Sequence, residues 1–422
     1  MIQGNWNPTR RAFLGTAAAA GALALGSRAT IAQEAGPIRV GLVGCGRRGL
    51  GAARDCVTSS PNVVITAIGD VFDDVMPEAR ERLAQLGDAY AVTDETAFTG
   101  FDAYQKVIDA DVDVVLLCAP PGFRPQHLEA AVAAGKHVFM EKPCAVCPAG
   151  VKSVFASSDA AAAKGLAIVS GTQRRHDSSY REIIRRVHDG AIGDIVSASC
   201  YWVGGYSYYP AVHRQEGWSD VEAMIRNWNY YTWLSGDHIV EQHVHNIDIM
   251  NWALDAVPQK AIGMGGRQQR TGPEYGHIYD HFAVEFEYPG GVRVTSLCRQ
   301  NNDCVSRVSE HLVGTMGVSN PANTIEGVNA YSFTGESPNP MVQEHANLIA
   351  SVRAGEPINE GRQLAESTLA AIMGRVAAYT GQEVTREFLL NESTLDLIPP
   401  HDLGFGDMDT PEIAVPGVTP LV

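Results

Sequence analysis

The stretch Ile38-Arg39-Val40-Gly41-Leu42-Val43-Gly44-Cys45-Gly46-Arg47-Arg48-Gly49 decides the fold of this 422-residue chain. Its first half is rich in strand-forming residues, its second half reads G-x-G-x-x-G, and the residues that follow suit a helix. In such a unit the first glycine permits a tight turn and the second lets the backbone approach a diphosphate, while the third lets the helix pack closely on the strand. The stretch therefore predicts a parallel α/β domain with a dinucleotide site at Gly44, Gly46 and Gly49.

A second strand, at 63–68, ends at Gly69-Asp70, so that a carboxylate follows Gly49 by 21 positions. A carboxylate there accepts hydrogen bonds from both ribose hydroxyls and repels a 2′-phosphate. Asp70 therefore favours NAD over NADP. Arg47 and Arg48 keep NADP open, because either guanidinium could neutralise that phosphate.

A further apolar strand, 113–118, stops at Pro120. His127 then opens a helix, and a strand at 136–140 leads into Glu141-Lys142-Pro143. With one more helix near 148–164, this β-α-β pattern predicts a Rossmann domain over residues 36–164.

At this point the sequence resembles the Gfo/Idh/MocA oxidoreductases, typified by glucose-fructose oxidoreductase and inositol dehydrogenase. Glu141-Lys142-Pro143 after the strand is the most specific mark, and 171–174 and 241–248 fall in the family's order. The resemblance implies a cofactor-bound carbohydrate or polyol enzyme and places Lys142 at the nicotinamide edge. The residues we expect to contact the cofactor are Gly44, Gly46, Arg47, Arg48, Gly49, Asp70, Pro120, His127, Glu141 and Lys142.

The second half is predicted to form an α+β domain over residues 165–340, with an open, largely antiparallel β-sheet and flanking helices. Strand patterns at 195–201, 282–288 and 292–297 carry that prediction. The resemblance implies that the free face of the sheet makes a subunit contact, in a homodimer or homotetramer. It also implies that helices in 341–390 pack back on the first domain. Residues 391–422 hold five prolines from Ile398 on and are expected to form an extended arm.

Four residues are candidates for catalysis. Oxidation of a carbinol needs a base for the hydroxyl proton and a positive group beside the developing alkoxide. Lys142 supplies the positive group, and His245 aligns with the family's histidine, so we assign it as the base. Glu241 is four positions earlier on the same helix face, and His243 adds a second imidazole.

The family pattern has Asp and Gly where this chain has Glu241 and His243, so the pocket is altered. His243 is either a second acid or base, or a hydrogen-bonded core histidine. A metal site is a weaker alternative, because the spacing of His238, Glu241, His243 and His245 matches no defined site. We therefore expect no metal.

Substrate contacts are predicted at Arg174, Arg175, His176 and Asp248. Between Tyr201 and Trp233 the chain holds six tyrosines and four tryptophans. Such rings suit stacking on a sugar, and packing beneath an insertion explains them equally well.

The composition excludes some partners and suggests a location. Lys and Arg total 32 against 48 Asp and Glu, a net charge of −16, so we expect no nucleic-acid partner. Thr9-Arg10-Arg11-Ala12-Phe13-Leu14 and the Ala/Gly/Leu run after it match a twin-arginine export signal over residues 1–32. The apolar run is too short for a membrane span. The sequence thus predicts a periplasmic or otherwise exported protein.

Export and a dinucleotide site together constrain the reaction, because free NAD is scarce outside the cytoplasm. We expect a tightly bound cofactor that is recycled within each cycle, in an oxidoreductase acting on a sugar, polyol or sugar derivative. Two alternatives stay open. One is a glycoside hydrolase or lyase that oxidises a hydroxyl transiently, and the other is a non-catalytic, cofactor-holding carbohydrate-binding protein.

Overall fold

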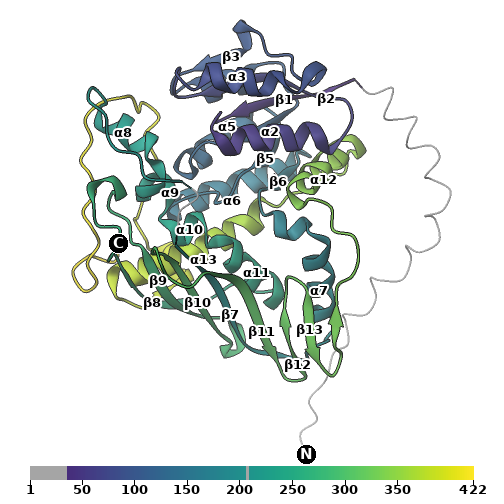
Figure 1. Cartoon of the computed structure of the whole chain (residues 1–422), viewed down its shortest axis with the longest axis vertical. Helices are drawn as coiled ribbons and strands as arrows, with labels where there is room; N and C mark the ends of the chain where they lie inside the picture. Colours follow the sequence, from purple (N-terminus) through teal and green to yellow (C-terminus); the bar gives the residue numbers. More distant parts are fainter. Residues whose placement is uncertain (1–35, 206–208) are drawn as a thin grey trace, which may run out of the picture.

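The computed structural model describes residues 36–205 and 209–422 (Figure 1). The expected export signal, residues 1–32, lies outside the described residues. The described chain forms a six-stranded and a nine-stranded sheet. In Figure 1 the helices α10 (His238–Glu241), α11 (Val244–Leu254) and α13 (Gly361–Thr380) lie between the two sheets.

The six-stranded sheet has the order β3-β2-β1-β4-β5-β6, and all its neighbouring strands are parallel. Its strands are β1 (Ile38–Val43), β2 (Val63–Asp70), β3 (Ala97–Thr99), β4 (Val114–Leu117), β5 (His137–Met140) and β6 (Ile168–Ser170). Its helices are α2 (Arg47–Ser59), α3 (Met76–Ala84), α4 (Ala103–Asp109), α5 (Arg124–Ala133) and α6 (Pro148–Ala163). This strand order confirms the predicted Rossmann domain, and it brings the carboxyl ends of β1, β2, β4 and β5 to one edge.

Two details differ from the sequence prediction. The parallel sheet includes β6, which lies beyond the expected boundary at 164, because Ile168 and Val169 pair with β5. Helix α5 begins at Arg124 rather than at His127, with a proline in its first turn. Proline is tolerated there because its missing N–H has no partner inside the helix.

The glycine turn has the geometry its sequence predicts. Gly44 adopts a φ of +93°, and a Cβ on Gly49 would lie 1.8 Å from the carbonyl oxygen of Gly44. Neither position accepts a side chain without moving the turn.

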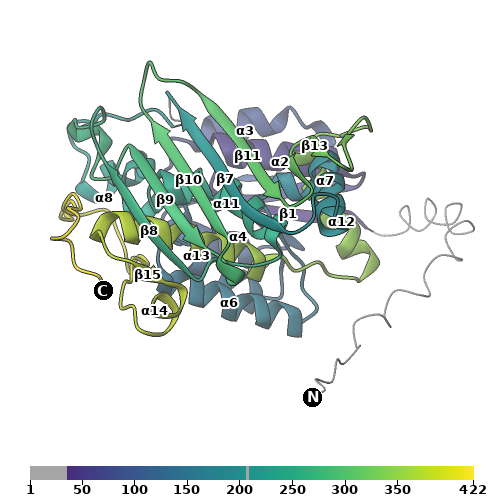
Figure 2. The same ribbon diagram turned by 90° about the horizontal axis from the view of Figure 1, so that it is seen from below.

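The nine-stranded sheet has the order β14-β13-β12-β11-β7-β10-β9-β8-β15. Its strands are β7 (Ile195–Gly204), β8 (Lys260–Gly266), β9 (His281–Glu287), β10 (Arg293–Gln300), β11 (Arg307–Gly314), β12 (Gly317–Asn320), β13 (Thr324–Gly327), β14 (Tyr331–Ser332) and β15 (Val384–Thr385). Only β7 and β10 pair in parallel, so the predicted open, largely antiparallel sheet is confirmed. Figure 2 shows this sheet in front of α11 and α13, on the face that these helices leave uncovered.

The last helices connect the two domains. Helix α12 (Pro340–Ala354) packs on α2, while α13 packs on α6 and also on β8 and β9. As expected, α12 packs on the first domain. Helix α13 packs on both domains, so the expectation holds for it only in part. After α14 (Arg386–Asn391) the chain has no helix or strand through residue 422. No helix in the described ranges combines the length and apolar character that a membrane crossing needs.

Candidate active site

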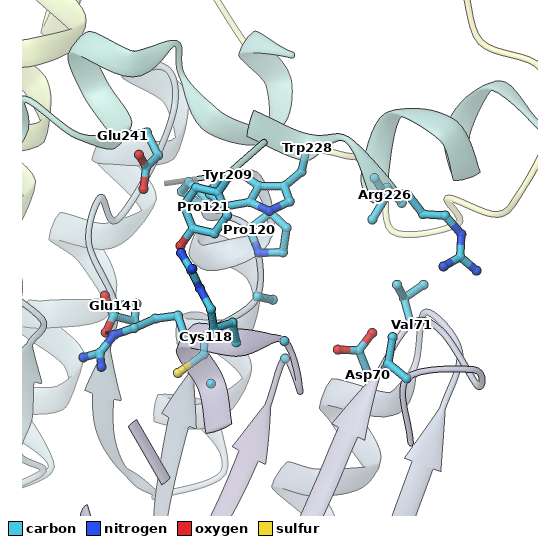
Figure 3. Close-up of a pocket in the computed structure, with 18 of the residues that line it drawn as sticks. Asp70, Val71, Cys118, Pro120, Pro121, Glu141, Tyr209, Arg226, Trp228 and Glu241 are labelled. Carbon is cyan, nitrogen blue, oxygen red and sulfur yellow. Dashed lines mark hydrogen bonds and ion pairs between the residues drawn. The ribbon is translucent and has the colours of Figure 1, made fainter. Parts of the chain in front are cut away.

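A cavity of about 870 Å³ lies between the two domains, at the carboxyl ends of the parallel strands. The glycine turn, Asp70 and Pro120 line it from the nucleotide domain, and Glu241 and His245 line it from the second domain. In Figure 3, Asp70 and Cys118 lie below the space, and Tyr209, Trp228 and Glu241 lie above it. Open α/β sheets bind ligands at this edge.

The glycine turn fits a dinucleotide. A Cβ on Gly46 would meet no atom within 4 Å, so this glycine faces open space in the cavity. No side chain caps the start of α2 at Gly46. The start of α2 and its backbone amide groups thus lie at the cavity wall, which suits a diphosphate.

Asp70 is held in place by the turn itself. Its Oδ2 accepts a hydrogen bond from the Cys45 amide at 2.7 Å, and its Oδ1 accepts one from the Phe72 amide at 3.1 Å. Burial raises the pKa of this carboxyl. A carboxylate has about four acceptor positions, so acceptor capacity remains for two ribose hydroxyls.

Arg48 is engaged by three carboxylates. Its guanidinium donates to Glu141, and pairs with Glu344 at 3.2 Å and with Asp55 at 3.5 Å. This corrects the expectation that Arg48 could neutralise a 2′-phosphate, because three acids already surround its charge. Arg47 lies 5.8 Å from the centre of the Tyr209 ring, at the cavity wall.

Lys142 and Glu241 join the two domains inside the cavity. The Lys142 Nζ lies 2.9 Å from Glu241 Oε1 and also donates to the Glu241 carbonyl oxygen. Their side chains are only 11% and 5% exposed. The ammonium is therefore fixed by the carboxylate and the carbonyl oxygen of one residue of the second domain.

His245 lies in the first turn of α11 and lines the same cavity. Burial lowers its pKa well below the ordinary value, and the nearby charges of Lys142 and Arg174 lower it further. Its ring stacks on Trp202 at 6.0 Å. A neutral imidazole that can accept a proton thus faces the cavity beside a fixed ammonium.

His243 does not reach the cavity, which corrects its assignment as a catalytic residue. It is fully buried. Its Nε2 lies 2.8 Å from the Ser296 hydroxyl and also contacts the Cys200 thiol. Burial lowers the pKa of His243 to about 3. It is a core histidine, as the alternative interpretation had it.

The four predicted substrate residues do not line the cavity either. Arg175 makes two hydrogen bonds to the Asp248 carboxylate, at 2.8 and 2.9 Å. Arg174 pairs with Glu310, and His176 lies 3.3 Å from Glu360. Arg174 and Arg175 thus pair with buried carboxylates, and His176 lies near a partly buried one. Gln173, one residue earlier, lines the cavity instead.

His127 lies beside the main cavity rather than in its lining. It is 6% exposed and stacks on Tyr104 at 4.2 Å and Phe123 at 5.9 Å. It borders a small adjoining space of about 70 Å³ that Asp70 and Pro120 also line. The expected cofactor contact is therefore corrected to a packing position beneath the site.

The aromatic residues between Tyr201 and Trp233 divide between the cavity wall and the core. Trp202, Tyr209, Trp218 and Trp228 line the cavity, whereas Tyr230, Tyr231 and Trp233 form a buried cluster. Tyr206 and Tyr208 lie outside the described residues. Among the residues with described positions, no group of three or more His, Cys, Asp or Glu side chains is arranged to hold a metal ion.

Sequence reasoning missed two arginines at the cavity. Arg226 pairs with Asp74 and Glu222 from the tip of α8 (Asp220–Arg226). Arg124 is 1% exposed and donates to the Leu117 carbonyl oxygen, and no carboxylate forms an ion pair with it among the described residues. No sequence signal marks Arg226, because its partner Asp74 is 152 positions away.

Family models match both domains. Residues 38–171 match the oxidoreductase family described as having an NAD-binding Rossmann fold, and residues 180–318 match the C-terminal domain of the same family. The chain belongs to the Gfo/Idh/MocA oxidoreductase family. The family's NAD-binding description confirms the cofactor predicted from Asp70.

Curated Gfo/Idh/MocA relatives match over part of their length. Inositol 2-dehydrogenase 3 of Saccharopolyspora erythraea is 30% identical over 260 residues, which are 61% of this chain and 65% of that protein. The 2,7-anhydro-N-acetylneuraminate hydratase of Escherichia coli is 24% identical over 260 residues, 61% of this chain and 60% of that protein. The chain thus spans less than two thirds of these relatives.

A solved Gfo/Idh/MocA structure shows the same fold. The scyllo-inositol dehydrogenase of Lactobacillus casei, solved with bound NAD(H) and scyllo-inositol, has a TM-score of 0.63 at 21% identity. The match covers 83% of this chain and 99% of that one.

Proposed function

We propose that the protein is an exported NAD-dependent oxidoreductase that acts on a hydroxyl of a sugar or polyol and keeps its dinucleotide between half-reactions. One observation carries the chemical part. Lys142 of the nucleotide domain and His245 of the second domain line the same cavity as the glycine turn and Asp70.

The roles of the side chains follow from their charge states. His245 is neutral because burial depresses its pKa, so it accepts the hydroxyl proton. The Lys142 ammonium stabilises the negative charge that develops on the oxygen, and Glu241 holds it in position. The nicotinamide, when bound, takes up and returns the hydride.

The cavity walls favour a ring-shaped substrate. Trp202, Trp218 and Trp228 give flat surfaces for the C–H face of a sugar or cyclitol. Inositol dehydrogenases among the relatives support a polyol or sugar as substrate.

Retention of the dinucleotide rests on the twin-arginine pattern at Arg10-Arg11. A cofactor carried outside the cytoplasm must be restored on the protein, so each oxidation is paired with a reduction. Incubation of purified mature protein with inositols and aldoses, without added NAD, should give oxidised and reduced products in equal amounts. Turnover only when free NAD is supplied would show that the cycle does not close on the protein.

A second candidate is cleavage of a glycoside through transient oxidation. A hydroxyl is oxidised, the neighbouring C–H gives up its proton, the aglycone leaves, water adds, and the hydride returns to the sugar. The hydratase among the relatives supports this candidate. His243 no longer does, because it lies in the core. Release of nitrophenol from aryl glycosides without added NAD would distinguish cleavage from paired redox.

We also propose that the uncovered face of the nine-stranded sheet forms a subunit contact. Ile262, Met264 and Val308 on its strands are 47–74% exposed. Light scattering after gel filtration should give the mass of a dimer or tetramer, and a monomer at micromolar concentration would contradict this proposal.

A further inference from the structure

Arg226 lines the end of the cavity beside Asp70. Its guanidinium lies 3.9 Å from the centre of the Phe72 ring and 4.9 Å from that of Trp218. It makes two hydrogen bonds of 3.1 Å to the Asp74 carboxylate and one of 2.9 Å to Glu222. Phe72 and Asp74 belong to the nucleotide domain and α8 to the second domain. Arg226 therefore ties the two domains together at this end of the cavity (Figure 3).

The C-terminal arm contacts Phe72 as well. Phe405 stacks on Phe72 with ring centres 5.7 Å apart and an interplanar angle of 11°. It also contacts the edge of Phe101, at 4.9 Å. The Phe72 ring thus contacts both the Arg226 guanidinium and the Phe405 ring.

The arm is fixed to α8 by two hydrogen bonds directly after Phe405. The Val221 amide donates to the Gly406 carbonyl oxygen at 3.1 Å, and the Met408 amide donates to Asp220 Oδ2 at 3.1 Å. Leu397 and Leu403 of the arm pack on the aromatic and aliphatic cluster of the second domain. The arm therefore joins α8 to the nucleotide domain independently of Arg226.

We propose that Phe405 of the C-terminal arm and Arg226 of α8 form a clasp over the adenosine end of the cavity, and that this clasp retains the dinucleotide. Asp70 defines that end, because the carboxylate after the second strand is the ribose-binding residue of the fold. The clasp rests on the proposed function, since it explains how the cofactor stays bound. Separating the domains at this end breaks an aromatic stack and the charge-assisted bonds to Asp74 and Glu222 together.

The test is the rate at which the full-length mature protein releases its dinucleotide. NADH-loaded protein is mixed with excess NAD, and the loss of bound NADH fluorescence is followed without any sugar. We expect Phe405→Ala to release NADH about threefold to tenfold faster than wild type, the effect of losing one aromatic stack. Arg226→Gln should also accelerate release, and the double variant more than either.

Ile413→Ala is the matched control, because Ile413 lies on the same arm, is 49% exposed and takes no part in the ring stack. Release from Phe405→Ala at the rate of Ile413→Ala overturns the clasp. Failure of the proposed function has a different signature. Turnover that needs added NAD would refute the closed cycle, while the ratio of release rates from the two variants still reports on the clasp.

Discussion

Gly46 keeps the cavity open at the start of α2, because its missing side chain leaves no atom within 4 Å of the Cβ position. A methyl group there meets no protein atom and occupies the space that the site offers to a diphosphate. Gly51, further along α2, does not line the cavity, and a Cβ there would lie 3.7 Å from the Arg48 side chain.

We therefore predict that Gly46→Ala folds normally and binds NAD at least tenfold more weakly. Gly51→Ala should bind NAD as the wild type does and gain about 0.5–1 kcal/mol of stability, since alanine suits a helix interior better than glycine. Isothermal titration and thermal unfolding measure both effects. Equal NAD affinity in the two variants would contradict the assignment of the turn.

His243 and His245 are two positions apart and have different surroundings. His245→Gln should lower kcat by about 10²- to 10⁴-fold, as expected when a general base is removed. His243→Gln should lower the stability and leave kcat of the folded protein within a fewfold. Steady-state kinetics on the substrate found in the product assay, together with circular dichroism, separate the two. A large loss of kcat in a well-folded His243→Gln would restore that residue to the site.

At the scale of elements, the pair Arg175–Asp248 holds α11 against the segment that follows β6. The Ser367 hydroxyl of α13 donates to Asp248 Oδ1 at 2.7 Å, so three elements meet at one carboxylate. Asp248 is 1% exposed. Removal of either partner leaves a buried charge without compensation.

Arg175→Met should therefore reduce the free energy of unfolding by about 3 kcal/mol and leave the KM for substrate unchanged. The double variant Arg175→Met/Asp248→Leu should recover part of the loss, because no unpaired charge remains. Urea denaturation of the three proteins tests this. A raised KM at unchanged stability would indicate that Arg175 contacts the substrate after all.

At the scale of the whole molecule, buried neutral histidines govern the response to acid. Burial lowers the pKa of His127, His243 and His345 to about 3 and of His277 to about 4, and holds that of His245 far below its usual value. In the unfolded chain a histidine titrates near 6.5. The unfolded state therefore binds more protons below that pH, and stability falls as the pH drops from 6.5 toward 4.

We predict a loss of about 1 kcal/mol per buried histidine between pH 7.5 and pH 5.5. His345→Leu should reduce this loss, because it removes one of the buried groups that take up a proton on unfolding. Neither ring nitrogen of His345 has a hydrogen-bond partner among the described residues, so the substitution gives up no hydrogen bond. The exposed His401→Gln serves as the control. Urea midpoints at three pH values measure the effect, and a stability that does not change with pH would contradict it.

The sequence by itself determined the nucleotide domain, the cofactor and the residues Gly44, Gly49, Asp70 and Lys142. These depend on sterics and hydrogen bonds within short segments, such as the positive φ of Gly44 and the Cys45 amide on Asp70. The spacing of apolar residues predicted the strands of both sheets, because that spacing is also a property of short segments. The sequence did not show which side chains of a predicted segment face the cavity. Gln173 lines the cavity, whereas the neighbouring Arg174 does not.

Only the tertiary structure decided which polar residues face the cavity. Arg175 and Asp248 are 73 positions apart, and Arg226 and Asp74 are 152 apart, so no local pattern reveals either pair. His243 and His245 differ because Ser296 of a distant strand lies beside the first, while Trp202 and the cavity lie beside the second. A charge or an imidazole takes its role from the partners that packing brings to it, and those partners come from elsewhere in the chain.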